Sequence, residues 1–291
     1  MVKNGYSQKD KSDRAVLNVR RTVSYIVLAI LTVICLFSFY ILIINASRSH
    51  PEIQKGFSAM PGKSLRINFN SLMSNDNLPV LRGILNSLLV SGGCAVLTTY
   101  FSALTAYAIH AYNFRFRKAA FYFILMIMMV PTQVTALGFV RQMNAMKLMD
   151  SFIPLILPSI AAPTVFFFMK QYMEGALPLE IVDAARIDGS GEFHTFNFVV
   201  MPILKPAMAV QAIFAFVTAW NNYFIPNLIL QSKMKKTLPI LIAQLRSADF
   251  LKFDMGQVYM MIAISILPVI VVYLCLSRFI VAGVALGSVK G

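Results

Sequence analysis

The segment VSYIVLAILTVICLFSFYILII, residues Val23–Ile44, contains no charged residue. It is apolar around the whole helical circumference, and it is long enough to cross the hydrocarbon core of a bilayer, which takes about 20 residues. It is also longer than the core of a secretory signal, and no small-x-small cleavage site follows it. We therefore expect it to remain in the chain as the first transmembrane helix.

The composition of the chain agrees with a membrane environment. Hydrophobic residues make up 58% of the sequence, charged residues 13%, and the mean hydropathy is +0.69. A soluble domain of this length cannot bury so much apolar surface. The net charge of +14 comes from basic residues scattered over segment ends and loops, without the basic stripe of a nucleic-acid-binding protein. We expect no nucleic-acid partner and contact with membrane lipid.

Further apolar segments predict an all-α polytopic membrane protein with about six transmembrane helices. The fourth contains three prolines, which membrane helices tolerate when neighbouring groups satisfy the freed backbone. The second is rich in small residues and is expected at the centre of the bundle. The segments are Val23–Ile44, Ile84–Ile109, Ala119–Val140, Phe152–Met169, Ala207–Leu230 and Gln257–Leu276. Residues 83–278 form the predicted transmembrane domain, with tails at 1–22 and 279–291 and an extracytoplasmic loop at 45–82.

Six crossings place both termini, and the loop between the fourth and fifth helices, on one side of the membrane. Basic residues before the first helix and in the short turn after the second make this side cytoplasmic: Lys3, Lys9, Lys11, Arg14, Arg20, Arg21, Arg115, Arg117 and Lys118. The opposite side nearly balances that count, with Arg48, Lys55, Lys63, Arg66, Lys233, Lys235 and Lys236. The orientation therefore rests on the first helix and the short turn, where the positive-inside rule is strongest.

The loop at residues 174–206 has a different composition from the spans around it. It contains five of the 12 acidic residues of the chain: Glu174, Glu180, Asp183, Asp188 and Glu192. Pro178 suits a first helical turn, Glu180 favours the positive end of a helix dipole, and Gly189 suits a C-terminal cap. The loop therefore predicts two short helices separated at Gly189.

Each predicted helix has an apolar face. Ile181, Ala184 and Ala185 lie at i, i+3 and i+4 and form a narrow face that a partner can approach closely. After Ser190, a predicted N-cap, a second face is formed by Phe193, Phe196, Asn197 and Val200, before Pro202 and Pro206 lead into the fifth span. A solvated connector is the alternative. The residues that start and stop helices at both ends of the loop, and the two apolar faces, favour a docking element instead.

These residues resemble a known family. Asp183-Ala184-Ala185, Gly189 and Val199-Val200-Met201-Pro202 are similar to the E-A-A-x-x-x-G-x(9)-I-x-L-P loop of ATP-binding-cassette (ABC) importer permeases, with conservative replacements of Glu, Ile and Leu. Trp220–Pro226 and the ending Gly283–Gly291 resemble the carbohydrate branch, in particular the maltose-type permease. The resemblance covers roughly residues 84–291.

The resemblance implies a type I importer fold in which the loop is a cytoplasmic coupling helix, seated in a groove of a separate ATPase. Its residues that would make this contact are Glu180, Asp183, Ala184, Ala185, Asp188, Gly189, Pro202 and Pro206. It further implies two ATPase subunits, a second homologous permease in a heterodimer, an extracytoplasmic solute-binding protein and the bacterial inner membrane. This chain would have no catalytic residue, metal or cofactor of its own, and the partner ATPase would use ATP and Mg²⁺.

Polar residues near mid-membrane are candidates for the substrate pathway, because they are costly there. They are Gln133, Gln211, Trp220, Asn221, Asn222 and Tyr223. Helix-to-helix hydrogen bonds and membrane-interface anchoring are equally open explanations for them. Amino-acid, peptide and anion permeases share the coupling loop, so a non-sugar solute is the alternative cargo.

Two other classes of membrane protein fit the sequence less well. A secondary transporter would need charges within the spans or repeated halves, and few such charges and no obvious repeat occur. A membrane enzyme would need a catalytic constellation. His50, His110 and His194 are instead far apart in sequence, and each lies next to a predicted loop or segment end.

Overall fold

The computed structural model describes residues 3–247 and 253–287, with side chains at 17–247 and 253–279. Across these ranges the regular structure is helical and includes no strand. Five helices are long and apolar enough to cross a membrane, or six when one bent pair counts as a single span. The predicted all-α polytopic architecture is confirmed. The side chains of the predicted signature at Gly283–Gly291 lie outside the described residues.

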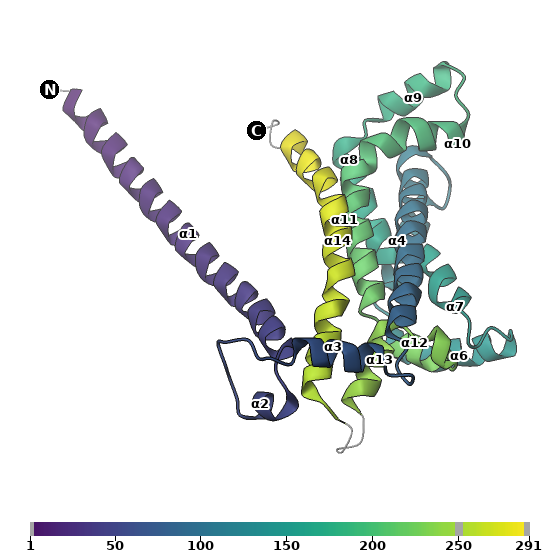
Figure 1. Cartoon of the computed structure of the whole chain (residues 1–291). Coiled ribbons are helices and arrows are strands. Elements are labelled where there is room, and N and C mark those ends of the chain that lie inside the picture. Colours follow the sequence, from purple (N-terminus) through teal and green to yellow (C-terminus); the bar gives the residue numbers. More distant parts are fainter. Residues whose placement is uncertain (1–2, 248–252, 288–291) are drawn as a thin grey trace. The chain divides into compact units, whose positions relative to one another are not determined.

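The helices follow one another through short connections (Figure 1). In chain order they are α1 (Lys3–Ala46), α2 (His50–Gln54), α3 (Leu65–Met73), α4 (Val80–Ala111), α5 (Arg117–Ile127), α6 (Thr132–Ala145), α7 (Ile153–Ile156), η1 (Leu157–Ile160), α8 (Pro163–Ala176), α9 (Leu179–Ile187), α10 (Glu192–His194), η2 (Thr195–Val200), α11 (Met201–Trp220), α12 (Phe224–Ile229), η3 (Lys233–Lys235), α13 (Leu238–Arg246) and α14 (Met255–Gly287). The chain divides into two units, Met1–Asn70 with Asp254–Ala263 and Ser71–Phe253 with Ile264–Gly291.

The first unit contains the long helix α1 and a compact junction at its C-terminal end. At this junction Arg48 is buried, and its guanidinium donates to Asn45 Oδ1 at 3.1 Å and to the carbonyl of Gly56 at 2.9 Å. Asn68 Nδ2 donates to the carbonyls of Ala46 and Arg48, both at 2.9 Å. These bonds tie the end of α1 to the segment that follows it and to α3. The predicted 45–82 loop is therefore partly folded.

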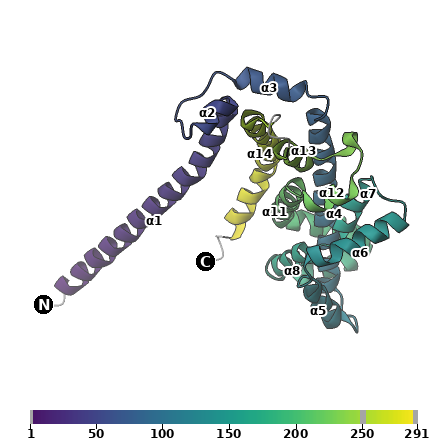
Figure 2. The same ribbon diagram turned by 90° about the horizontal axis from the view of Figure 1, so that it is seen from below.

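The second unit is built around α4, which packs against α8 and α11 (Figures 1 and 2). Small residues such as Ala103 and Ala106 are fully buried in α4, and this lets the neighbouring helices approach closely. A core cluster extends from these residues through Met169 and Met173 of α8 to Val182 of α9. The central position expected for the second span is thus observed, and the same core reaches the candidate loop.

The third predicted span, Ala119–Val140, is not one continuous helix. It is replaced by α5 and α6, which meet at an angle of 95°. The break falls between Met128 and Pro131, and Pro131 has the extended backbone of an N-cap, with ψ of 131°. Proline cannot donate a backbone hydrogen bond and disfavours helix in the residue before it, so α5 ends and a new helix begins.

The fifth predicted span, Ala207–Leu230, is placed too far along the chain. The observed helical span is Glu192–Trp220, and a separate short helix, α12, follows it. Pro206 lies inside α11 instead of before it. The sequence prediction failed here because prolines are tolerated within membrane helices and apolar composition does not mark where a helix begins.

Candidate functional site

Helix α9 packs against η2, and its apolar residues belong to the same core cluster as the C-terminal end of α4 (Figure 1). Val182 is fully buried, and Leu177, just before the helix, is 2% exposed. His110 near the C-terminal end of α4 contacts the carbonyl of Leu177 through Nε2 at 3.0 Å. The predicted face of Ile181, Ala184 and Ala185 is not the buried one, since Ile181 and Ala184 are exposed. Packing within the chain uses Val182, which leaves the predicted face open.

Gly189 terminates α9 in a left-handed conformation, with φ of 78°. Its N–H donates to the carbonyl of Arg186 at 3.0 Å, and the N–H of Ser190 donates to the carbonyl of Ala185 at 3.0 Å. A Cβ at Gly189 would meet no atom within 4 Å. Glycine is therefore required by the backbone conformation and not by a lack of space. This is the break predicted from the sequence.

A charged network ties α9 to α10 and to the end of α4. Arg186 Nε donates to Glu192 Oε1 at 2.9 Å, and Arg186 Nη1 donates to Asp183 Oδ1 at 3.1 Å. The hydroxyls of Tyr112 and Tyr107 both donate to Glu192 Oε2. Arg186 also lies over the Tyr112 ring, 5.2 Å from its centroid. The hydrogen bond to Glu192, followed by contacts with Tyr112 and Asp183, raises the pKa of Arg186, so the guanidinium stays charged.

The network divides the acidic residues of the loop into two groups. Asp183 and Glu192 are bound to Arg186 within the chain. Glu180 and Asp188 are exposed and have no hydrogen-bond or ion-pair partner among the residues that the structure describes. Beside them, the side chain of Ile187 is 86% exposed. Glu180, Asp188 and Ile187 are therefore the residues of α9 and its C-cap that remain available for contact with another molecule.

The second half of the loop is continuous with the next span. Gly191 is the N-cap of α10, where Ser190 was predicted, and Ser190 instead bonds to the hydroxyl of Thr195 at 2.8 Å. The π-helix η2 then joins α10 to α11, so Pro202 and Pro206 both lie within helix. Of the predicted second face, Phe196 and Val200 are buried and Phe193 is 71% exposed. The segment from α10 to α11 is therefore one continuous helical stretch that leads from the loop into a membrane-spanning helix.

A second polar site lies at the opposite end of α11. Trp220 is 3% exposed and stacks on Phe216, with ring centroids 5.6 Å apart. It borders a cavity of about 410 Å³. Three of the six predicted pathway residues line this cavity, together with residues of α13 and α14: Trp220, Asn221, Tyr223, Leu238, Arg246 and Ser265. Gln133, Gln211 and Asn222 do not line it.

Hydrogen bonds hold the cavity wall against α4. Asn86 Nδ2 donates to the carbonyls of Met234 and Lys236 at 2.9 and 3.0 Å. The N–H of Leu238 donates to Ser87 Oγ at 2.8 Å. Asp150 accepts the backbone N–H of Ser232 at 2.9 Å. Partial burial opposes ionisation of this carboxyl, but the hydrogen bonds from Ser232 outweigh it and lower the pKa of Asp150.

The chain matches the family model described as binding-protein-dependent transport system inner membrane component over residues 99–285, more than half of its length. It belongs to this family of importer permeases. The permease is 32% identical to the arabinooligosaccharides transport system permease protein AraQ of Bacillus subtilis (strain 168), over 90% of this chain and 92% of AraQ. It is 28% identical to the lactose transport system permease protein LacG of Rhizobium radiobacter, over 92% and 96% of the two chains.

One further relative and one solved structure are also similar to this chain. The permease is 29% identical to the sn-glycerol-3-phosphate transport system permease protein UgpE of Yersinia pestis bv. Antiqua (strain Antiqua), over 89% of this chain and 94% of UgpE. Its fold is similar to a chain from the crystal structure of a bacterial ABC transporter involved in the import of the acidic polysaccharide alginate. That comparison has a TM-score of 0.75 and 19% identity, and it covers 90% and 96% of the two chains.

Family membership settles the class of protein. The permease is a multi-pass inner-membrane subunit of an ABC importer and a transport protein, not an enzyme. An ATPase and a substrate-binding protein are the partners that the family implies. The residues that sequence reasoning missed are the internal ties of α9, namely Tyr107, Tyr112 and Arg186. A pattern within the loop did not reveal the tyrosines, because Tyr107 of α4 and Tyr112 just after it are far from the loop in sequence.

Proposed function

We propose that α9 is the element through which an ATPase moves this permease. The observation that carries the proposal is the attachment of α9 to the core that it shares with α4 and α11, through Val182, and to α10, through the Arg186–Glu192 pair. The exposed side chain of Ile187 and the unpaired carboxylate of Asp188 next to it would contact the ATPase groove. Closure of the ATPases would then shift the equilibrium between two arrangements of the transmembrane helices. Such a shift is coupling in the thermodynamic sense.

Ile187→Asp tests the docking surface. Because an aspartate here would have to be desolvated in an apolar groove, we expect retention of the co-expressed ATPase during purification to fall by roughly tenfold or more. Ile67→Asp is the matched control, since Ile67 is also exposed, at 64%, but lies on α3. Unchanged ATPase retention in Ile187→Asp would contradict docking through α9.

The orientation proposed for the permease places both termini and α9 in the cytoplasm. The support is the parity of six crossings, with the bent pair α5 and α6 counted as one span, and the basic residues at the N-terminus and between α4 and α5. Purified ATPase should therefore bind to inside-out vesicles that contain the permease and not to right-side-out ones. Binding to right-side-out vesicles alone would contradict this orientation and indicate the opposite topology.

The proposed assembly contains two ATPase subunits and a second, homologous permease in a heterodimer, with an extracytoplasmic binding protein. This chain would supply half of the pathway and hold no cofactor, while ATP and Mg²⁺ would be used by the ATPases. The support is the family itself, whose description names binding-protein dependence. The mass of the intact purified complex tests this subunit ratio, and a complex with two copies of this chain and no second permease would contradict the heterodimer.

The proposed cargo is a carbohydrate, with an oligosaccharide favoured. Relatives named for arabinooligosaccharides and lactose support this class. In the cavity beside α11, the indole of Trp220 can stack on a sugar ring, and Asn221 and Tyr223 can bond to hydroxyls. Trp220→Ala should therefore lower the transport rate about tenfold or more for every sugar carried, measured as uptake into proteoliposomes. Gln133→Ala, outside the cavity, serves as the control. Unchanged transport kinetics in Trp220→Ala would show that the cavity is not part of the substrate pathway.

Arg246 favours a second candidate, an anionic solute, because its guanidinium borders the same cavity. A relative named for sn-glycerol-3-phosphate transport supports this alternative. Stimulation of the intact importer's ATPase by neutral oligosaccharides favours the first candidate. Stimulation by phosphorylated polyols alone favours the second.

A further inference from the structure

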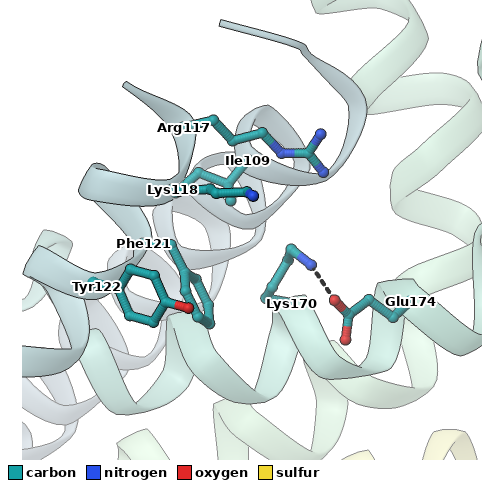
Figure 3. A pocket seen from close by; sticks show the side chains of 7 residues that line it. All are labelled: Ile109, Arg117, Lys118, Phe121, Tyr122, Lys170 and Glu174. Carbon is teal, nitrogen blue, oxygen red and sulfur yellow. Dashed lines mark hydrogen bonds and ion pairs between the residues drawn. The ribbon is translucent and has the colours of Figure 1, made fainter. Parts of the chain in front are cut away.

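A second hollow lies at the end of the second unit that bears α9, away from the cavity beside Trp220. It has a volume of about 400 Å³ and is enclosed by the C-terminal end of α4, the start of α5 and the second half of α8. Figure 3 shows its charged side chains around one space. They are Arg117, Lys118, Lys170 and Glu174.

The charges of this hollow do not cancel within the chain. Lys170, which is 7% exposed, pairs with Glu174 at 2.5 Å (Figure 3). Arg117 donates to Asn113 Oδ1 at 2.7 Å and to the carbonyl of His110 at 3.3 Å, two neutral acceptors that orient the guanidinium without neutralising it. Within the described part of the chain, the ammonium of Lys118 has no ion-pair or hydrogen-bond partner. The hollow therefore presents a net positive charge with unused N–H donors.

The wall beside these cations becomes apolar along α5. Lys118, Tyr122 and Met126 are spaced at i, i+4 and i+8 and lie on one face of the helix. Tyr122 is 61% exposed and Met126 is 59% exposed, and no residue of α5 is buried. A ligand that places an anionic group at Lys118 can thus lay an apolar chain along the same face.

We propose that this hollow binds the headgroup of an anionic phospholipid, with its phosphodiester between Arg117 and Lys118 and an acyl chain along α5. Basic pockets between transmembrane helices on the cytoplasmic side are suited to such headgroups, because the charges attract the phosphate and the adjoining surface is apolar. Arginine and lysine bonds to phosphate are charge-assisted and are therefore stronger than bonds between neutral groups. A soluble phosphate would use the cations but leave the apolar face uncovered.

The hollow is also connected to the coupling loop. Helix α8, which supplies Lys170 and Glu174, leads directly into α9, and His110 of α4 contacts the carbonyl of Leu177 at 3.0 Å. A lipid held here would bridge α5 and α8 next to the element proposed to receive the ATPase. The inference itself needs only the membrane location of the chain and not the proposed docking, so the two can fail separately.

The test is native mass spectrometry of the full chain, delipidated in neutral detergent and then supplied with equal amounts of dioleoyl phosphatidylglycerol or dioleoyl phosphatidylcholine. We expect one phosphatidylglycerol molecule to be retained preferentially. In R117Q/K118Q, the loss of two charges should lower this retention by roughly tenfold or more. The control R141Q/K147Q removes two exposed basic residues elsewhere in the chain and should match the wild type.

Three results would overturn the proposal: equal retention of both lipids, equal loss of phosphatidylglycerol in the two double variants, or displacement by free sn-glycerol 3-phosphate. The last would identify a soluble phosphate site in place of a lipid site. If R117Q/K118Q fails to fold, K118Q alone keeps the test decisive, because Lys118 makes no bond within the described chain. It should still reduce phosphatidylglycerol retention several-fold.

Discussion

Replacing Gly189 by proline is expected to abolish both retention of the ATPase and transport, while membrane insertion persists. Proline fixes φ near −65°, whereas Gly189 has φ of 78°. The substitution also removes the N–H that donates to the carbonyl of Arg186. The local cost is about 3 kcal/mol or more, enough to displace α9 from its seat at the end of α4. Co-purification of the ATPase and uptake into proteoliposomes measure the result.

A pair of alanine variants isolates the backbone effect. At both Gly189 and Gly191 an added Cβ would meet no atom within 4 Å, but only Gly189 has a positive φ. Gly189→Ala should cost about 1–2 kcal/mol, because a left-handed conformation is unfavourable for alanine. Gly191→Ala should cost less than about 1 kcal/mol, as at an ordinary N-cap. Equal ATPase retention in the two variants would contradict a role for the left-handed turn.

The sequence predicted the parts of this site that depend on local chemistry. A proline before a helix and a glycine after it determine the backbone conformation at their own positions, without help from tertiary contacts. The limits of α9 were therefore predictable from Pro178 and Gly189 alone. Long apolar runs likewise predicted the membrane spans, because lipid leaves little other choice of structure. The resemblance then named the partner that a loop of this kind contacts.

The sequence did not predict features that depend on tertiary contacts. Asp183 was interpreted as a docking group together with Glu180 and Asp188, but it is bound to Arg186 within the chain. Glu192, which pairs with Arg186, also accepts hydrogen bonds from Tyr107 of α4 and from Tyr112 just after it, and the loop sequence does not reveal these contacts. The bend at Pro131 and the continuation of the loop into α11 were missed for a related reason. In membrane helices, neighbouring groups decide whether a proline breaks the helix, as at Pro131, or is accommodated, as at Pro206.

Reversing the charge of Glu192 is expected to uncouple ATP hydrolysis from transport. In Glu192→Lys the ammonium would face the guanidinium of Arg186, and both tyrosine hydroxyls would lose their carboxylate acceptor. Hydrogen bonds to charged groups are worth about 1.5–3 kcal/mol each, and partial exposure of this pair reduces that to about 1 kcal/mol. With this link between α9 and the end of α4 lost and only the core contact of Val182 kept, ATPase movement should reach the helices less efficiently, and the ATP hydrolysed per sugar transported should rise several-fold.

Two comparisons separate this internal role of Glu192 from direct contact with the ATPase. Glu180→Lys makes the same charge change on α9 at a residue with no partner in the described chain. It should cost the permease at most about 1 kcal/mol, the value of an acidic residue in a first helical turn, and lower the thermal stability less than Glu192→Lys does. The exchange Arg186→Glu with Glu192→Arg restores opposite charges across the pair and should recover much of that stability and coupling. If the exchange rescues neither property, the Arg186–Glu192 pair does not hold α9 in place, and the rigidity of the lever must come from Val182 and the Gly189 turn alone.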